Sequence, residues 1–196
     1  MIPFVLALSL ALAAPPVRPA APEVNPRVIL RTEMGDITIE VAVDQAPLTA
    51  ANFLRYVDAG RYNGTVFHRT VTPSSPRNKP VPIAVIQGGQ VVGDKSFPAI
   101  ALERTSATGL RHADGAVSMA RSGPDTATSS FFICVGDQPE LDFGGKRNAD
   151  GQGFAVFGRV VAGTEVVRRI HQSPVDEREL LTPSIRILTA SRVPPM

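Results

Sequence analysis

The sequence predicts a mainly β protein in which the strands form a closed antiparallel barrel flanked by two α-helices. Short runs of β-type composition dominate the chain, and only two segments show a helical spacing of apolar residues. The 18 prolines and 16 glycines favour many turns over long helices. A closed barrel removes the unpaired edges that so many short strands would otherwise expose, so we prefer it to an open sheet.

Length and composition are those of one globular domain with short extensions. The chain has 196 residues, of which 43% are apolar and 19% charged, and this balance separates it from disordered chains. The net charge of +2 is small and dispersed, so we expect no nucleic-acid partner. The single cysteine, Cys134, lies in an apolar run that predicts burial, and the three histidines are scattered. We therefore expect no internal disulfide and no metal site.

The N-terminus carries an apolar run over residues 2–14 that is too short to span a bilayer as a stable helix. Its end, Ala11-Leu12-Ala13, has the small-x-small form of a signal-peptidase site. We predict a signal peptide over residues 1–14, a Pro/Ala-rich linker over 15–26 and a folded domain over 27–192. The protein is then periplasmic or secreted in a bacterium, with no stable membrane insertion after processing. The alternative is an ordinary buried segment, because no Lys or Arg precedes the run.

The first elements of the domain are a hairpin and a helix. Residues 28–32 have strand composition, residues 33–36 form a turn, and residues 37–41 alternate apolar and polar side chains as a half-buried strand does. Pro47 suits the first position of a helix, and Gly60 suits its end. The apolar face expected for this helix consists of Leu48, Ala51, Phe53, Leu54 and Val57.

The rest of the chain alternates short strands with loops. Four prolines between residues 72 and 82 exclude a helix and a central strand, so this segment is a predicted loop. Residues 93–114 lack periodicity and are predicted as a loop that has room for short elements. A second helix is predicted over residues 165–171. Further strands are predicted at a run ending with Arg69 and over residues 83–87, 117–119, 131–135, 154–161 and 185–188.

Three motifs carry the strongest functional signal. The first follows an Asn-Gly turn and ends in Phe67-His68-Arg69, the second is Val85-Ile86-Gln87-Gly88-Gly89, and the third includes Phe131-Phe132-Ile133. Together they resemble the cyclophilin-type peptidyl-prolyl cis-trans isomerases, and the resemblance covers most of the chain after about Pro26. It implies a cyclophilin-like barrel and isomerisation of X–Pro bonds without a cofactor.

The chemistry that the resemblance implies is rotation about an amide bond. This rotation is slow because the amide has partial double-bond character, with a barrier of about 18–20 kcal/mol. A catalyst must hold the proline ring and the flanking backbone, and it must stabilise the twisted amide, whose nitrogen becomes a better hydrogen-bond acceptor. A fixed arginine suits this task because it is always charged and presents several donors in one plane.

The resemblance assigns site roles to particular residues. Arg69 matches the catalytic arginine, and Gln87 matches the glutamine that contacts the substrate backbone. The expected substrate-binding residues are Val85, Ala120, Arg121, Phe132, Leu141 and Phe154. Among these, Phe132 is the floor of the proline pocket and Leu141 a wall. Ala120 and Arg121 match a backbone-binding Ala-Asn pair in which arginine replaces asparagine, and Phe154 replaces a frequent histidine.

The predicted activity is therefore a peptidyl-prolyl cis-trans isomerase that assists folding of exported proteins. Its partners would be proline-containing polypeptides in an unfolded or extended state, and it would act as a monomer. The alternative is a catalytically weak or inactive peptide-binding module, a holdase on the same barrel. Arg69 and Gln87 favour the enzyme, whereas Ala84 and Glu140, which replace larger pocket residues of the family, favour the module.

The loop over residues 72–82 joins the segment of Arg69 to the segment of Gln87, so both of its ends reach the expected groove. Its prolines stiffen it, and its cations Arg77 and Lys79 are expected to be exposed. A stiff basic flap of this kind would select clients with acidic residues near proline. The alternative is a solvated insertion without a role.

Overall fold

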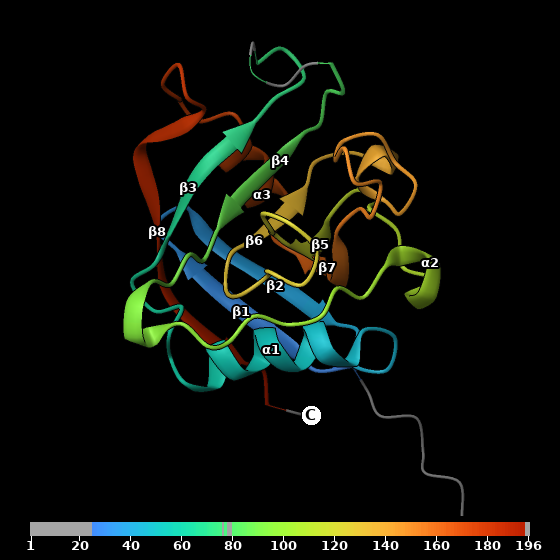
Figure 1. The fold of residues 1–196 in the computed structure, drawn as a ribbon. Helices are drawn as coiled ribbons and strands as arrows, with labels where there is room; N and C mark the ends of the chain where they lie inside the picture. The colour runs from blue at the N-terminus through green and yellow to red at the C-terminus, as the bar shows by residue number, and fades with distance from the viewer. Residues whose placement is uncertain (1–24, 76, 78–79, 195–196) are drawn as a thin grey trace, which may run out of the picture.

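The computed structural model describes residues 25–75, 77 and 80–194, so the predicted signal peptide and most of the predicted linker lie outside the described residues. The chain forms a closed eight-stranded barrel in the order β1-β2-β7-β5-β6-β4-β3-β8, with every neighbouring pair antiparallel (Figure 1). This confirms the predicted fold class. The strands are β1 (Arg27–Thr32), β2 (Gly35–Val41), β3 (Val66–Val71), β4 (Val85–Gly88), β5 (Ala116–Met119), β6 (Phe131–Cys134), β7 (Ala155–Ala162) and β8 (Leu180–Arg192).

The helix α1 (Pro47–Asp58) begins at the expected proline, but its buried face differs from the predicted one. Leu48 is 53% exposed, and Ala51 is exposed as well. Polar contacts turn another side inward: Thr49 Oγ1 donates to Glu103 Oε2 at 2.6 Å, and Asn52 Nδ2 donates to a backbone carbonyl at 2.5 Å. Phe53, Leu54 and Val57 are buried as predicted. The prediction was wrong at Leu48 and Ala51, because apolar spacing contains no information on hydrogen bonds to a segment far along the chain.

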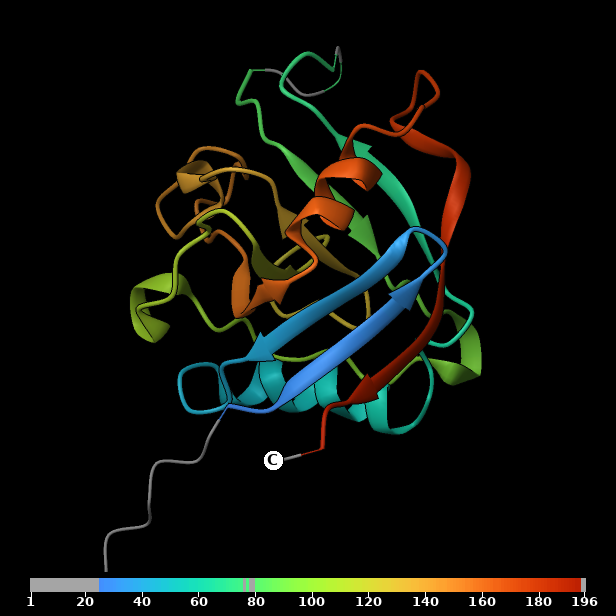
Figure 2. The same cartoon turned by 180° about the vertical axis from the view of Figure 1, so that it is seen from behind.

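The described residues form three helices where two were predicted. α3 (Thr164–His171) matches the second expected helix and lies at the opposite end of the barrel from α1 (Figures 1 and 2). The additional helix, α2 (Thr105–Thr108), and the 3-10 turn η1 (Gly93–Lys95) fall in a stretch predicted as loop, because single turns are too short to show periodicity. A further 3-10 turn, η2 (Pro139–Leu141), precedes β7. Within the described part of the chain, no helix has the length and apolarity needed to cross a membrane.

The strand β8 is much longer than the predicted strand over residues 185–188. It pairs with β3, placing Leu180 opposite Arg69, and with β1, placing Arg192 opposite Val28. The apolar pattern underestimated the strand because only every second to fourth residue of β8 is buried, and the others face solvent. Its two sets of partners make β8 the strand that closes the barrel.

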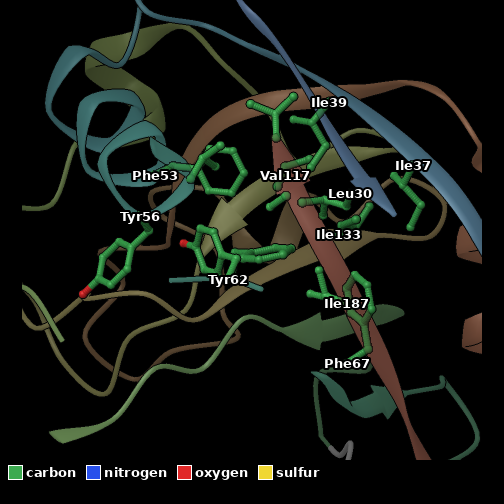
Figure 3. Close-up of a cluster of buried hydrophobic side chains, with 14 of the residues drawn as sticks. Leu30, Ile37, Ile39, Phe53, Tyr56, Tyr62, Phe67, Val117, Ile133 and Ile187 are labelled. Carbon is green, nitrogen blue, oxygen red and sulfur yellow. The ribbon is translucent and has the colours of Figure 1, made fainter. Parts of the chain in front are cut away.

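The core inside the barrel is built around a cluster of aromatic rings (Figure 3). Phe53 from α1 lies 4.8 Å from Phe157 and 5.4 Å from Tyr62, measured between ring centroids. Phe131 meets Tyr62 edge to face at 5.5 Å, and Phe67 meets Phe131 in the same way at 5.9 Å. These geometries add to the stabilisation from burial of the rings.

Two glycines at the end of β4 let that strand lie directly on these rings. A Cβ atom at Gly88 would stand 2.7 Å from Phe67 Cδ1. At Gly89, where φ is +70°, a Cβ atom would overlap the Phe131 ring and lie 2.9 Å from Tyr62 Cε1. The Gly-Gly pair is therefore required by close packing, and at Gly89 also by backbone conformation.

The strand β6 divides its side chains between two apolar clusters. Phe131 lies in the barrel core, whereas Phe132 lies on the outer face with Val85, as the predicted alternation requires. Cys134 is buried in the outer cluster, and burial raises the pKa of its thiol. This confirms a packing role for the cysteine. The outer cluster forms the base on which the candidate site is built.

Candidate active site

A hollow of about 200 Å³ opens on the outer side of the barrel over β3, β4 and β6, and we call it the β4 pocket. The residues that the sequence singled out and that line it are Arg69, Val85, Gln87, Phe132, Leu141 and Phe154. Three further lining residues, Ile83, Arg147 and Asn148, were not predicted. The structure thus brings residues from four separate segments of the sequence into one pocket.

Strand register places the polar and aromatic groups of the pocket in one row. Arg69 on β3 pairs with Gln87 on β4, and Gln87 pairs with Phe132 on β6. Arg69 Nη1 donates to Gln87 Oε1 at 3.4 Å, and Gln87 Nε2 donates to Ser130 Oγ at 3.2 Å. The glutamine is therefore held from both sides, and the two polar side chains lie beside an aromatic floor.

The guanidinium of Arg69 is anchored by a buried carboxylate that sequence reasoning missed. Arg69 Nε and Nη2 both donate to Glu179 Oε2, at 3.2 and 2.5 Å. The Glu179 side chain is only 4% exposed, whereas Arg69 is 34% exposed, so the cation still reaches the pocket. The backbone of Glu179 has φ of +67°, and its carbonyl accepts from Thr70 N at 3.1 Å. No local pattern marks Glu179, which is 110 residues from Arg69.

A buried histidine supports the aromatic floor from behind. The His112 ring stacks on Phe132 with centroids 5.8 Å apart and an interplanar angle of 12°. Its Nδ1 lies 2.8 Å from Asp142 Oδ1 and its Nε2 3.0 Å from Ser118 Oγ, so both ring nitrogens are partnered. Burial lowers the pKa of His112 and outweighs the opposing effect of Asp142. Phe154 forms a wall beside this floor, meeting Phe132 edge to face at 5.2 Å.

The structure places Ala120 and Arg121 outside the β4 pocket. They line a neighbouring polar hollow of about 250 Å³ that shares Gln87 with it. The Arg121 side chain is 2% exposed, because its Nε donates to Gly153 O at 2.7 Å and its two Nη atoms donate to Asp150 at 2.7 and 2.9 Å. Arg121 therefore clamps the loop that precedes β7. Its contact with substrate stays a prediction.

The clamp predicts an unusually acidic carboxyl group. Hydrogen bonds from Arg121 lower the pKa of Asp150 from 3.8 to about 2. Because the folded-state pKa is depressed, the clamp contributes fully above about pH 4 and is lost as the pH falls through about 2. A ¹³C NMR titration of the Asp150 carboxyl should give a midpoint near 2, and Arg121→Gln should move it towards 3.8. A midpoint near 3.8 in the unaltered protein would contradict the clamp.

Comparison with known proteins agrees with this architecture. Residues 27–192 match the family described as cyclophilin type peptidyl-prolyl cis-trans isomerase/CLD. Peptidyl-prolyl cis-trans isomerase A of Dickeya dadantii (strain 3937) is 40% identical over 148 residues, covering 74% of this chain and 70% of that protein. Peptidyl-prolyl cis-trans isomerase of Acinetobacter baylyi is 38% identical over 153 residues, covering 76% and 74%.

A solved structure supports the fold separately. A crystal structure of a Cryptosporidium parvum cyclophilin type peptidyl-prolyl cis-trans isomerase, determined in the presence of the dipeptide Ala-Pro, aligns with a TM-score of 0.69. It covers 86% of this chain and 99% of that chain at 24% identity. With the family match over residues 27–192 and the bacterial relatives, the conclusion follows: the chain belongs to the cyclophilin-type peptidyl-prolyl cis-trans isomerases, which catalyse rotation about X–Pro peptide bonds.

Proposed function

We propose that the β4 pocket is the site of isomerisation, with Arg69 as the catalytic residue and Gln87 as the residue that holds the substrate backbone. The observation that carries this proposal is the row formed by Arg69, Gln87 and Phe132 on three neighbouring strands. It puts a charged donor, a backbone-binding amide and an apolar floor within one small pocket. These are the three groups that rotation about an X–Pro bond needs.

In this arrangement the proline ring packs on Phe132, with Val85, Leu141 and Phe154 as walls. Gln87, held by Ser130, contacts the peptide backbone that flanks the ring. Arg69 then presents its donors to the prolyl nitrogen, which gains acceptor strength as the amide twists. Since Glu179 fixes the guanidinium beforehand, little reorganisation is needed when the twisted amide forms.

The decisive measurement is turnover on a short X–Pro peptide by NMR exchange spectroscopy, compared with binding of the same peptide. The enzyme should raise the exchange rate between cis and trans at substoichiometric concentration. Binding without added exchange would instead describe the holdase. Glu140 is one of the residues that favoured the holdase alternative. It does not line the pocket; its Oε2 accepts a hydrogen bond from Lys146 N at 2.8 Å, within the loop.

The clients we propose are proline-containing segments of exported proteins. Support comes from the apolar run over residues 2–14 and from the Ala11-Leu12-Ala13 motif. Mass spectrometry of the protein from its native host should give a mature N-terminus near Ala14 or Pro15. Fractionation should place that form outside the cytoplasm. A full-length product in the cytosol would refute export and leave the isomerase assignment untouched.

A further inference from the structure

The β4 pocket contains a second guanidinium group, that of Arg147, from the loop between η2 and β7. The backbone of this residue is fixed by a hydrogen bond from its N–H to Glu140 O at 3.1 Å. Its side chain is partly buried, and Nη1 donates to Val81 O at 2.7 Å, on the segment that enters β4. Arg147 is thus held at the pocket by contacts from two loops.

The residues described as lining the β4 pocket include two cations and no carboxylate. Arg69 and Arg147 both line it, and the nearby carboxylate, Glu179, is buried and accepts two hydrogen bonds from Arg69. Burial lowers the pKa of Arg147, the charge of Arg69 lowers it further, and Glu179 opposes both effects. The two guanidinium groups therefore repel each other in a partly desolvated space. A substrate carboxylate would relieve this repulsion.

A second donor lies in the same wall. Asn148 lines the β4 pocket, and its Nδ2 atom is buried without a hydrogen-bond partner in the described structure. Buried donors without partners are rare in proteins, so this amide is a second candidate donor for an anion bound in the pocket. The side chains of Leu141 and Ile83 carry no acceptor, and a substrate carboxylate would supply one.

We propose that Arg147 is a specificity-determining residue that binds a carboxylate close to the substrate proline. The enzyme then turns over peptides with an acidic group near proline faster than neutral ones. This inference rests on the proposed substrate pocket. The cation proposed to select acidic peptides is therefore Arg147 in the pocket wall, not the cations of the loop over residues 72–82. Of those loop cations, Arg77 is exposed as predicted, and Lys79 lies outside the described residues. The carboxylate has two possible sources, an Asp or Glu side chain or the C-terminus of a short peptide.

The test uses the full chain and matched peptides that differ in one group. One pair carries Glu or Gln beside the proline with a blocked C-terminus, and the other pair is neutral with a free or an amidated C-terminus. NMR exchange spectroscopy gives kcat/KM for each peptide. We expect the acidic member of at least one pair to exceed its neutral partner by about tenfold at low salt, as for a charge-assisted pair in a partly buried site. The ratio should shrink as salt is raised.

Three variants locate the effect. Arg147→Gln should bring the acidic-to-neutral ratio close to one, and Arg147→Lys should retain part of it because the charge remains. Arg77→Gln, which removes the same charge from the exposed loop, should leave both the ratio and the turnover of the neutral peptide unchanged. Using a ratio within each variant cancels any general loss of activity or folding.

The outcomes separate this inference from the site proposal. An unchanged ratio in Arg147→Gln, or a ratio lost in Arg77→Gln instead, would overturn the role of Arg147. A ratio of one in the unaltered protein for both peptide pairs would also overturn it. None of these results affects the assignment of Arg69, whose replacement is expected to lower turnover of acidic and neutral peptides together.

Discussion

Arg69→Ala is expected to lower kcat/KM on an X–Pro peptide by about 100-fold or more, on the order of 3 kcal/mol. The reason is that Arg69 is the group in the β4 pocket that is both aimed by a buried carboxylate and next to the aromatic floor. Lysine should restore little activity, because its ammonium lacks the planar fork of donors. Exchange spectroscopy on a neutral peptide measures the effect.

The controls for Arg69→Ala take account of Glu179, the buried carboxylate that pairs with Arg69. Removing Arg69 leaves the Glu179 carboxylate buried without its cation, which by itself is destabilising. The double variant Arg69→Ala with Glu179→Gln removes that charge, and it should fold well while remaining equally inactive. Arg77→Ala, at an exposed position, should keep full activity. Activity near that of the unaltered protein in Arg69→Ala would refute the mechanism.

Gly89→Ala is expected to destabilise the barrel by about 3 kcal/mol. A positive φ costs a non-glycine residue roughly 1–2 kcal/mol, and overpacking of a core typically adds 1–3 kcal/mol. At Gly89, where φ is +70°, the new methyl group would press on the Phe131 ring and on Tyr62. Urea unfolding monitored by circular dichroism gives the change in the free energy of unfolding.

Gly109 provides a matched control for the cost of placing a non-glycine residue at a positive φ. Its φ is +73°, almost that of Gly89, but a Cβ atom there would meet no other atom within 4 Å. Gly109→Ala should therefore show the conformational cost alone, about 1 kcal/mol. Equal losses at the two glycines would mean that ring packing at Gly89 contributes nothing, contrary to our expectation.

The strands that combine apolar runs with turn signals were predictable, and the reason is local. The hairpin of β1 and β2 follows from alternation and a turn, and the division of Phe131 and Phe132 between two faces follows from the pleat. The inner face of α1 was predictable only in part, because Thr49 is buried through its hydrogen bond to Glu103, a residue on a distant segment. Local patterns cannot report such contacts.

The candidate site likewise has some residues that local sequence motifs mark and others that they do not mark. Arg69, Gln87 and Phe132 each sit in a motif that strand pairing brings into one row, and the structure places them together. Glu179 and Arg147 sit in polar loops with no motif of their own. They reach the pocket only because the closed barrel brings those loops to it. Sequence patterns therefore indicate the strand-borne part of the site, and the loop-borne part requires the fold.

The position of β8 also sets the order in which a newly made chain becomes active. β8 pairs with both β1 and β3, so the barrel stays open until this strand has left the ribosome. Glu179 lies directly before β8 in the chain. Arg69 therefore gains its buried partner only when β8 pairs and the barrel closes. Because such long-range pairing forms slowly, a nascent chain would carry the strand-borne part of the candidate site before Arg69, the proposed catalytic residue, is oriented. Turnover would then begin only after β8 has paired with β1 and β3.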